Sequence, residues 1–195
     1  VFEKLLDKEG LSLKMPESEK EPRDIVRAKA KRLTAKKKEN FIEGRLGLII
    51  DGTGKDYDKI AGQATKLKQL GYDVHMIFVN TSLDVALERN AKRDRTVPES
   101  IAIKSWNDVQ RNIGKFSQYF RQNFVVVDNN DPLKNDGQIF NSVFKQIKSL
   151  ANKRIYNKIA YKWIGDELRR RGIQGATPAN VHSFRKKAVK GYGQR

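Results

Sequence analysis

Three short apolar runs, separated by longer stretches of helical periodicity, constrain the fold of this chain more than any other feature. Each run has the length of a strand and lacks the alternation of polar and apolar residues typical of a strand with one solvent face. We therefore expect an α/β fold with a parallel sheet that helices cover on both faces. The expected strands span residues 46–50, 74–79 and 124–127.

The stretches around these runs carry apolar residues three and four positions apart, which predicts amphipathic helices. The helix between the first two runs would complete a βαβ unit. Three strands are fewer than an average sheet contains, so we expect part of the sheet to be missing from these residues. The expected helices span roughly residues 21–42, 60–70, 82–93, 98–122, 136–150 and 155–168.

The first apolar run leads into a Gly-rich stretch, Asp-Gly-Thr-Gly-Lys, at residues 51–55. Such a turn between a strand and a helix is a common anion cradle, because backbone N–H groups and a helix N-terminus converge there. The spacing is not that of a Walker A loop, since Ile49 stands where the first Gly is required and Asp56 where the hydroxyl is required. The stretch therefore indicates some other loop of a nucleotide-type fold.

Asp51 and Thr53 follow the carboxyl end of the first expected strand, where ligands bind in open α/β sheets. At that position Asp51 can orient a phosphate-bound magnesium or a metal-bound water, and Thr53 can donate to a substrate oxygen. The alternative is that Asp51 caps the next helix while the glycines only make the turn. Lys55 is expected to face solvent.

Polar groups also follow the second and third expected strands. Arg89 and Arg93 are four residues apart on an expected helix, so both guanidinium groups can reach one polyanion, with Arg95 just beyond. Arginine suits phosphoryl transfer, in which the protein positions groups and neutralises phosphate charge; a solvated basic face is the alternative. Asp128 and Asn129 can hold a base or ribose, or form a turn.

Composition narrows the class of protein. The chain has 195 residues, enough for one domain with an appendage, and no cysteine, which excludes disulfides and thiolate metal sites. Its two histidines argue against a zinc site. No apolar stretch approaches a membrane span and no signal peptide opens the sequence, so we expect a soluble, cytoplasmic protein without a membrane partner.

Positive charge is concentrated at the C-terminal end. The formal net charge is +17, and residues 153–195 contain 12 basic and two acidic side chains. A polybasic segment of this kind favours a phosphate-rich partner such as nucleic acid. The alternative is a solvated tail that only repels itself.

Three stretches carry a resemblance to a known family: GLIIDGTGKD, LKQLGYDVHMIFVNTSLDVALERNAKRDRTVPES and WNDVQRNIGKF. Together they resemble the zeta-toxin and polynucleotide-kinase type of P-loop kinases, in particular the phage-encoded predicted kinases of that group. The resemblance covers about residues 1–150. Its most specific part is the order of strand, Asp-Gly-Thr, helix, Gly-Tyr-x-Val strand, and an Arg-x-x-x-Arg-x-Arg lid followed by Val-Pro.

This resemblance implies an ATP- and Mg²⁺-dependent kinase with an arginine lid at about residues 89–98. The acceptor would be a nucleotide sugar, a nucleotide or a polynucleotide end, and the oligomeric state stays open. The implied site residues are Asp51 and Thr53 lining the site, Arg89, Arg93 and Arg95 in the lid, Arg23 and Arg27 facing the acceptor, and Asp128 and Asn129 near the nucleotide.

Relatives of this type carry a Walker A loop and a catalytic aspartate upstream of the segment that corresponds to VFEKLL, and neither is present in these 195 residues. We therefore expect residues 1–152 to be the downstream part of a P-loop kinase-like core, with little activity alone, followed by a basic helix and tail at 153–195. The alternative is a noncatalytic nucleic-acid-binding or phage structural protein that uses residues 153–195 as an arm.

Overall fold

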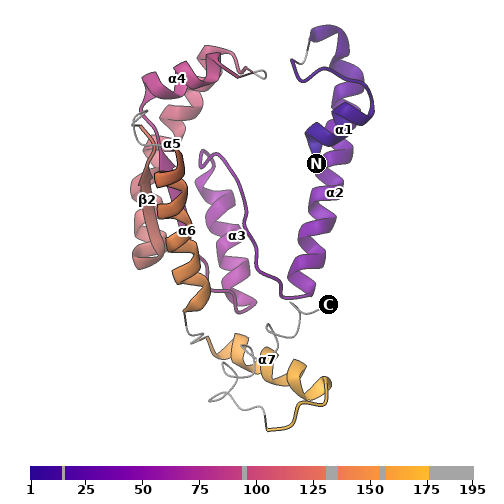
Figure 1. Cartoon of the computed structure of the whole chain (residues 1–195), viewed down its shortest axis with the longest axis vertical. Helices are drawn as coiled ribbons and strands as arrows, with labels where there is room; N and C mark the ends of the chain where they lie inside the picture. The colour runs from indigo at the N-terminus through magenta and orange to yellow at the C-terminus, as the bar shows by residue number, and fades with distance from the viewer. Residues whose placement is uncertain (15, 94–95, 131–135, 154–156, 176–195) are drawn as a thin grey trace. The chain divides into compact units, whose positions relative to one another are not determined.

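A computed structural model describes residues 1–14, 16–93, 96–130, 136–153 and 157–175 (Figure 1). The chain divides into two compact units, one of Val1–Thr53 with Ser82–Asp108 and one of Gly54–Thr81 with Val109–Arg195. Within the described ranges the elements are α1 (Phe2–Lys8), η1 (Glu17–Glu19), α2 (Lys20–Glu43), α3 (Tyr57–Gln69), β1 (Met76–Asn80), α4 (Leu83–Ala91), α5 (Glu99–Phe120), η2 (Arg121–Asn123), β2 (Phe124–Asp128), α6 (Asp136–Asn152) and α7 (Lys158–Arg170).

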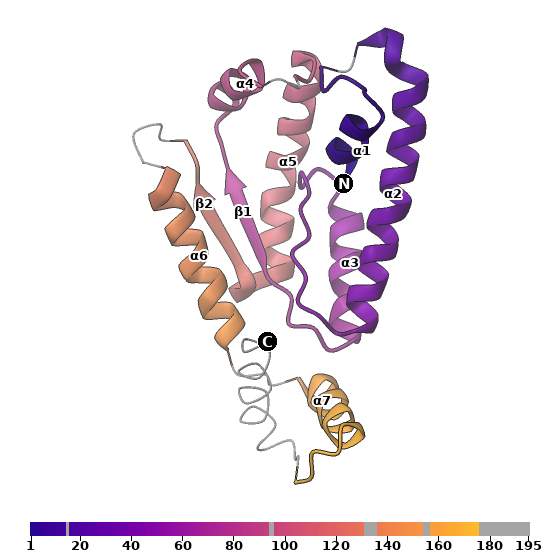
Figure 2. The ribbon, with the colours of Figure 1, turned by 45° about the vertical axis from the view of Figure 1, so that its right-hand side comes forward.

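A parallel pair of strands, β1 and β2, forms the sheet of the second unit (Figure 2). Their register runs from Met76 opposite Phe124 to Asn80 opposite Asp128, so both strands end at the same edge. The helix-rich α/β class with a parallel sheet is thus confirmed. The pair connects the second and third expected strands, and the βαβ unit predicted between the first and second is not formed in the described chain.

The expected strand at 46–50 is wrong. This segment has no strand structure, and Ile49 is 88% exposed. It leaves α2 through Arg45, which has a positive φ of 52°, while the Leu46 N–H donates to the Phe41 carbonyl to close the helix end. An apolar run becomes a strand only where a neighbouring strand supplies hydrogen bonds, and no described strand pairs with this one.

Helices cover the two strands less completely than the sequence predicted. Phe78 of β1 and Val127 of β2 are buried, but Val79 is 53% exposed and Val126 is 52% exposed. The two exposed valines belong to opposite faces, because Val79 pairs in register with Val127 and Val126 with Phe78. Neither face of this two-stranded sheet is therefore fully covered by the described residues.

An aromatic core holds the second unit together. Phe116 of α5 is fully buried, and it packs with Ala64 of α3 and with Phe120. The rings of Tyr57 and Phe116 lie 5.4 Å apart between centroids, in the tilted geometry that aromatic pairs favour. This core joins α3 to α5 and also contacts the start of both strands through Met76 and Phe124.

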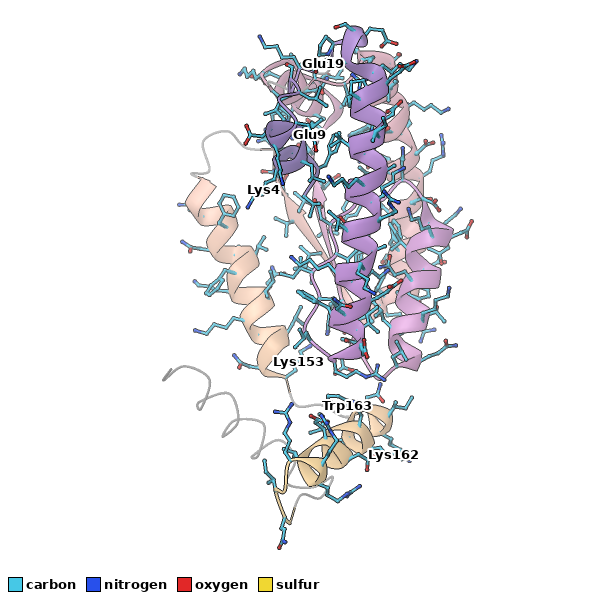
Figure 3. The ribbon with its side chains drawn as sticks, turned by 90° about the vertical axis from the view of Figure 1, so that its right-hand side faces the viewer. Lys4, Glu9, Glu19, Lys153, Lys162 and Trp163 are labelled. Carbon is cyan, nitrogen blue, oxygen red and sulfur yellow. The ribbon has the colours of Figure 1, made fainter. Side chains whose placement is uncertain are left out.

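In the first unit α1 packs against α2 (Figure 3). Leu6 is fully buried, and Val26 and Ala30 of α2 are each 5% exposed, whereas the apolar residues Ile25 and Leu33 of the same helix are 71% and 48% exposed. The Arg27 guanidinium lies 5.6 Å from the ring centre of Phe2, an arrangement that adds a cation–π contact to this packing.

None of the helices in the described ranges combines the length and apolarity that a membrane crossing requires.

The domain boundary expected between residues 152 and 153, where the kinase-like core would meet the basic helix and tail, stays a prediction.

A half-buried titratable group, His75, lies at the start of the sheet. His75 immediately precedes β1, and among the described residues its Nδ1 atom is buried without a hydrogen-bond partner. Burial, and secondly the positive charge of Lys153, lower the pKa of His75 from its ordinary 6.5, while Asp73 opposes the shift. The folded state therefore disfavours the protonated imidazole.

Because the folded pKa lies below the unfolded pKa, the unfolded chain binds more protons as the pH falls below 6.5. We predict that the free energy of unfolding is fully retained above that pH and decreases as the pH falls through the folded pKa. Urea unfolding of the protein and of His75→Asn at about pH 7.5 and about pH 5.5 measures this difference. The variant should lose less stability between the two pH values, and an identical pH dependence would contradict the assignment.

Candidate functional site

The carboxyl ends of β1 and β2 form a polar edge in the second unit. The Asn129 N–H donates to the Asn80 carbonyl at 2.9 Å, which continues the ladder one step beyond the strands. The Gln110 side chain of α5 donates to Oδ1 of Asn80 at 3.2 Å. Ligands of parallel α/β sheets bind outside this end of the strands, so the edge is a candidate binding surface.

Asp128 is exposed at this edge, and one of its oxygens is already used. Oδ1 accepts hydrogen bonds from the backbone N–H of Asn130 at 3.0 Å and from its side-chain amide at 2.6 Å. This is the turn that the sequence allowed as the alternative. A nucleotide contact by Asp128 therefore depends on its second oxygen, and the roles of Asp128 and Asn129 stay predictions.

The backbone of the Gly-rich stretch is hydrogen-bonded by one side chain of α5, that of Asn112. Gly54 is buried with a φ of +78°, a conformation that favours glycine, and a Cβ there would lie 3.8 Å from Phe78. The side-chain amide of Asn112 donates to the carbonyls of Gly54 at 3.2 Å and Lys55 at 2.9 Å. The turn between residues 53 and 56 is thus fixed on the aromatic core.

Asp56, rather than Asp51, caps α3. Its Oδ1 accepts a hydrogen bond from the Lys59 N–H at 3.0 Å. The capping role considered for Asp51 is therefore wrong, and the carboxylate of Asp51 is exposed. Thr53 and Lys55 are also exposed, as expected for Lys55, and Asp51 and Thr53 belong to the first unit.

Replacing Asn112 by alanine should destabilise the protein, because two carbonyls of the Gly-rich turn lose their donor. An unsatisfied buried acceptor costs about 1–3 kcal/mol, which would appear in the urea-unfolding free energy. Asn141→Ala, which removes an exposed asparagine of α6, is the matched control and should change stability by less than about 0.5 kcal/mol. Equal effects of the two substitutions would show that Asn112 does not hold the turn.

The arginines of the expected lid lie on and after α4 in the first unit. Arg89 is on the helix and half-buried, whereas α4 ends at Ala91, so Arg93 follows the helix instead of lying on its face. The predicted helix through Arg93 is therefore two residues too long. No described carboxylate pairs with Arg89 or Arg93, and Arg95 lies outside the described residues.

Lys92, which lies next to these arginines in the sequence, forms an ion pair with Glu88. The Nζ atom of Lys92 lies 2.5 Å from Oε1 of Glu88, and its hydrogen bond and charge lower the pKa of that carboxyl. Glu88 therefore stays ionised and paired with Lys92. Among the described residues of this stretch, Arg89 and Arg93 form no ion pair, although the charge of Arg89 also lowers the pKa of Glu88, to a smaller extent than Lys92 does.

Asn90 joins the end of α4 to Val97 through two hydrogen bonds. Its amide donates to the Val97 carbonyl at 2.7 Å, and its Oδ1 accepts from the Val97 N–H at 3.0 Å. Asn90 lies at helical spacing from the apolar residues Leu83, Ala86 and Leu87, and no function was predicted for it from the sequence. A polar amide at an apolar position was the available signal, since buried amides usually bind backbone groups.

Loss of the two Asn90 hydrogen bonds should open this loop more often. Asn90→Ala is therefore expected to raise the rate of trypsin cleavage after Lys92 or Arg93 by about thirtyfold, since two hydrogen bonds of about 1 kcal/mol each are removed. Mass spectrometry of the early fragments identifies the cut. Asn107→Ala on α5, in the same unit, is the control, and a rate equal to that of the control would contradict the role of Asn90.

Arg23 and Arg27, the expected acceptor-binding residues, take different positions on α2. Arg23 is only 9% exposed, and its Nη1 donates to the Pro16 carbonyl at 3.1 Å, which ties the preceding loop to the helix. Arg27 is exposed, 3.6 Å from Asp24 in addition to its contact with Phe2. Contact with an acceptor stays a prediction for both residues, and Arg27 is the more accessible.

The donor set does not fit a complete metal site. Among the described residues no group of three or more histidine, cysteine or acidic side chains could hold a metal ion. A Mg²⁺ ion prefers several oxygen ligands, including carboxylates and phosphate oxygens, and Asp51 and Asp128 belong to different units. No catalytic step is therefore assigned to a metal ion.

Comparison with known proteins gives one match. The family model described as Zeta toxin matches residues 14–138, which is more than half of the chain. No curated protein and no solved structure matches the sequence. The matched range includes α2, the Gly-rich turn, both strands, and Arg89 and Arg93 on and after α4.

Proposed function

Because the chain belongs to the zeta toxin family, we propose that it is an ATP-dependent phosphotransferase. The family match over residues 14–138 is the observation that carries this proposal. It supports a kinase-like domain, and the helix-rich α/β architecture with a parallel strand pair is compatible with it.

In the proposed reaction an acceptor hydroxyl oxygen forms a bond to the γ-phosphorus of ATP. The bond between that phosphorus and the bridging oxygen breaks, ADP leaves, and the hydroxyl proton passes to a base. Negative charge spreads over the phosphoryl oxygens during the transfer, so cationic donors stabilise the transition state. This requirement is the reason for assigning a role to arginines.

Arg89 and Arg93 are the proposed phosphate-clamping residues, with Arg95 as a third member. Their support is chemical, because neither Arg89 nor Arg93 is neutralised by a described carboxylate while the adjacent Lys92 is paired. Both belong to the same unit as Asp51 and Thr53. An uncompensated guanidinium is able to bind two phosphate oxygens through its planar fork of N–H donors.

The remaining assignments follow from chemistry and exposure. Asp51 and Thr53 would line the site with an exposed carboxylate and hydroxyl, Arg27 would contact the acceptor, and Arg23 would position the loop before α2. Asp128 and Asn129 would contact the nucleotide. ATP supplies the transferred phosphoryl group and Mg²⁺ neutralises its charge in kinases of this kind.

The acceptor is proposed as a class. A nucleotide sugar, a nucleotide and a polynucleotide end each offer a hydroxyl next to phosphate groups, and the exposed Arg27 suits an acceptor with its own negative charge. Separate assays with the three acceptor types distinguish them.

The test is transfer of labelled γ-phosphate by protein expressed from its full reading frame. Arg93→Ala should lower kcat by about 10²-fold or more, because loss of a transition-state charge clamp has effects of that size. Lys104→Ala removes an exposed cation of α5 in the same unit and should leave kcat within about twofold. Circular dichroism checks that both variants are folded.

Two results would contradict the proposal in different ways. Absence of phosphate transfer to all three acceptor classes, in folded protein with ATP and Mg²⁺, would remove the phosphotransferase activity. Transfer that Arg93→Ala leaves unchanged would retain the activity and remove the assigned role of this arginine.

A further inference from the structure

Helix α7, outside the matched family range, has ends fixed by its own residues. Asn157 caps the N-terminus, because its Oδ1 accepts from the Ile159 N–H at 2.9 Å. At the other end Gly172 has a φ of +74°, and the Ile173 N–H donates to the Leu168 carbonyl at 2.9 Å. This pair of features is a Schellman motif, so α7 is a defined helix.

The start of α7 is anchored on the turn between α3 and β1, within the second unit. Gly71 has a φ of +92°, and a Cβ at this position would lie 2.9 Å from the backbone nitrogen of Ala160 and 3.2 Å from Ile159 Cγ2. Two backbones approach this closely only where a side chain is absent. The helix is therefore held against the strand-bearing body.

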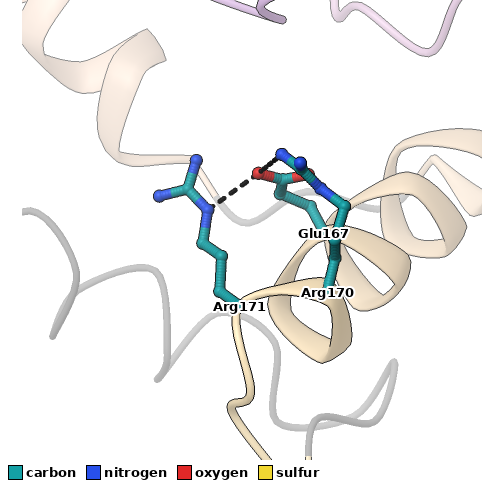
Figure 4. Close-up of polar contacts among 3 residues, drawn as sticks. All are labelled: Glu167, Arg170 and Arg171. Atoms are coloured by element: carbon teal, nitrogen blue, oxygen red, sulfur yellow. Dashed lines mark hydrogen bonds and ion pairs between the residues drawn. The ribbon is translucent and has the colours of Figure 1, made fainter.

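Both carboxylates of α7 form ion pairs with arginines at the C-terminal end of the helix, and Figure 4 shows those of Glu167. Glu167 accepts a two-pronged contact from Arg170, at 2.8 and 2.9 Å, and a third hydrogen bond from Arg171 at 2.7 Å. These contacts lower the pKa of Glu167 to about 2, so it remains ionised at neutral pH. Asp166 pairs with Arg169 in the same way.

The lysines of this region keep their charge unpaired. Lys158 and Lys162 are exposed and one turn apart, so they lie on one face of α7, and Lys153 precedes the helix. None of the three forms an ion pair with a described residue. Asp166 and Glu167 are also the only acids in the sequence from residue 153 onward, which has 12 basic side chains.

We propose that the cationic face of α7, formed by Lys158 and Lys162, binds the phosphate backbone of nucleic acid, independently of base sequence. A stretch with so many cations and no free carboxylate is complementary to a regular array of phosphates. Lys158 and Lys162 are the described residues that contact phosphate. This binding goes beyond the proposed phosphate transfer and does not depend on it.

The packing of α7 favours nucleic acid over an anionic membrane. A helix that lies on a membrane inserts a free apolar face between lipids. In α7 most apolar side chains pack within the protein, because Leu168 is 6% exposed and contacts Tyr161, Ile164 and Ile173, while Ile159 is 50% exposed. The side chains left to a partner are mainly cationic.

The experiment measures binding of a fluorescein-labelled DNA duplex of mixed sequence by fluorescence anisotropy between about 50 and 200 mM KCl. The full chain should bind with an affinity that falls steeply with salt. The variant Lys158→Gln with Lys162→Gln should bind about tenfold more weakly and reduce the logarithmic salt slope by about 2, one for each lost phosphate contact.

The matched control is Lys4→Gln with Lys8→Gln on α1. It removes the same charge from exposed lysines with the same spacing and should leave affinity within about twofold. Vesicles of phosphatidylcholine with phosphatidylserine provide the membrane probe. A second variant, in which Arg185, Lys186 and Lys187 become glutamine, tests the basic sequence beyond α7.

Weaker binding by the α7 variant, with the α1 control unchanged, supports the proposal. Equal losses in the two variants would overturn it, because net charge alone would explain them. The proposal also fails if no salt-dependent DNA binding occurs, if only the 185–187 variant binds more weakly, or if vesicles bind while DNA does not. Phosphate transfer measured in parallel shows whether the catalytic proposal stands or falls separately.

Discussion

The hydrogen bonds from Asn112 to the carbonyls of Gly54 and Lys55 are the constraint on which the local structure depends. They fix the Gly-rich turn on the Phe116 core, with Gly54 in a conformation that a larger residue would strain. Asp56 can then cap α3, and the core made by α3 and α5 supports the start of both strands. The side chain of Asn112 thus connects the aromatic core to the Gly-rich stretch, which was considered from its sequence as an anion-binding loop.

The functional account separates into parts that rest on different observations. Family membership rests on the match over residues 14–138 and supports a phosphotransferase. The assignment of Arg89 and Arg93 rests on the absence of an ion pair to either arginine among the described residues and on the Asn90 contacts that join the end of α4 to Val97. The nucleic-acid surface rests on α7, which lies beyond the matched range and has its own caps and charge pairs. Failure of one part leaves the others to be judged separately.

Periodicity predicted the helices well because amphipathic stripes such as that of Phe116 and Phe120 depend on local spacing. It failed at residues 46–50, since strand formation depends on a hydrogen-bonding neighbour that a sequence pattern does not report. The family resemblance was confirmed by the comparison, while the site residues stay predictions. Asn90 and Asn112 were missed because their partners are backbone N–H and carbonyl groups, which a sequence pattern does not reveal. A polar residue that interrupts the apolar face of an expected helix indicates such a hydrogen bond to the backbone.

A crystal structure of the protein from its full reading frame, with a non-hydrolysable ATP analogue and Mg²⁺, tests the central claim most directly. That claim is that this zeta toxin family member uses Arg89 of α4 and Arg93, which follows α4, to hold phosphate during transfer. We expect guanidinium nitrogens of Arg89 and Arg93 within about 2.7–3.2 Å of phosphate oxygens. Phosphates bound by other groups, with both guanidinium groups left in solvent, would contradict the claim.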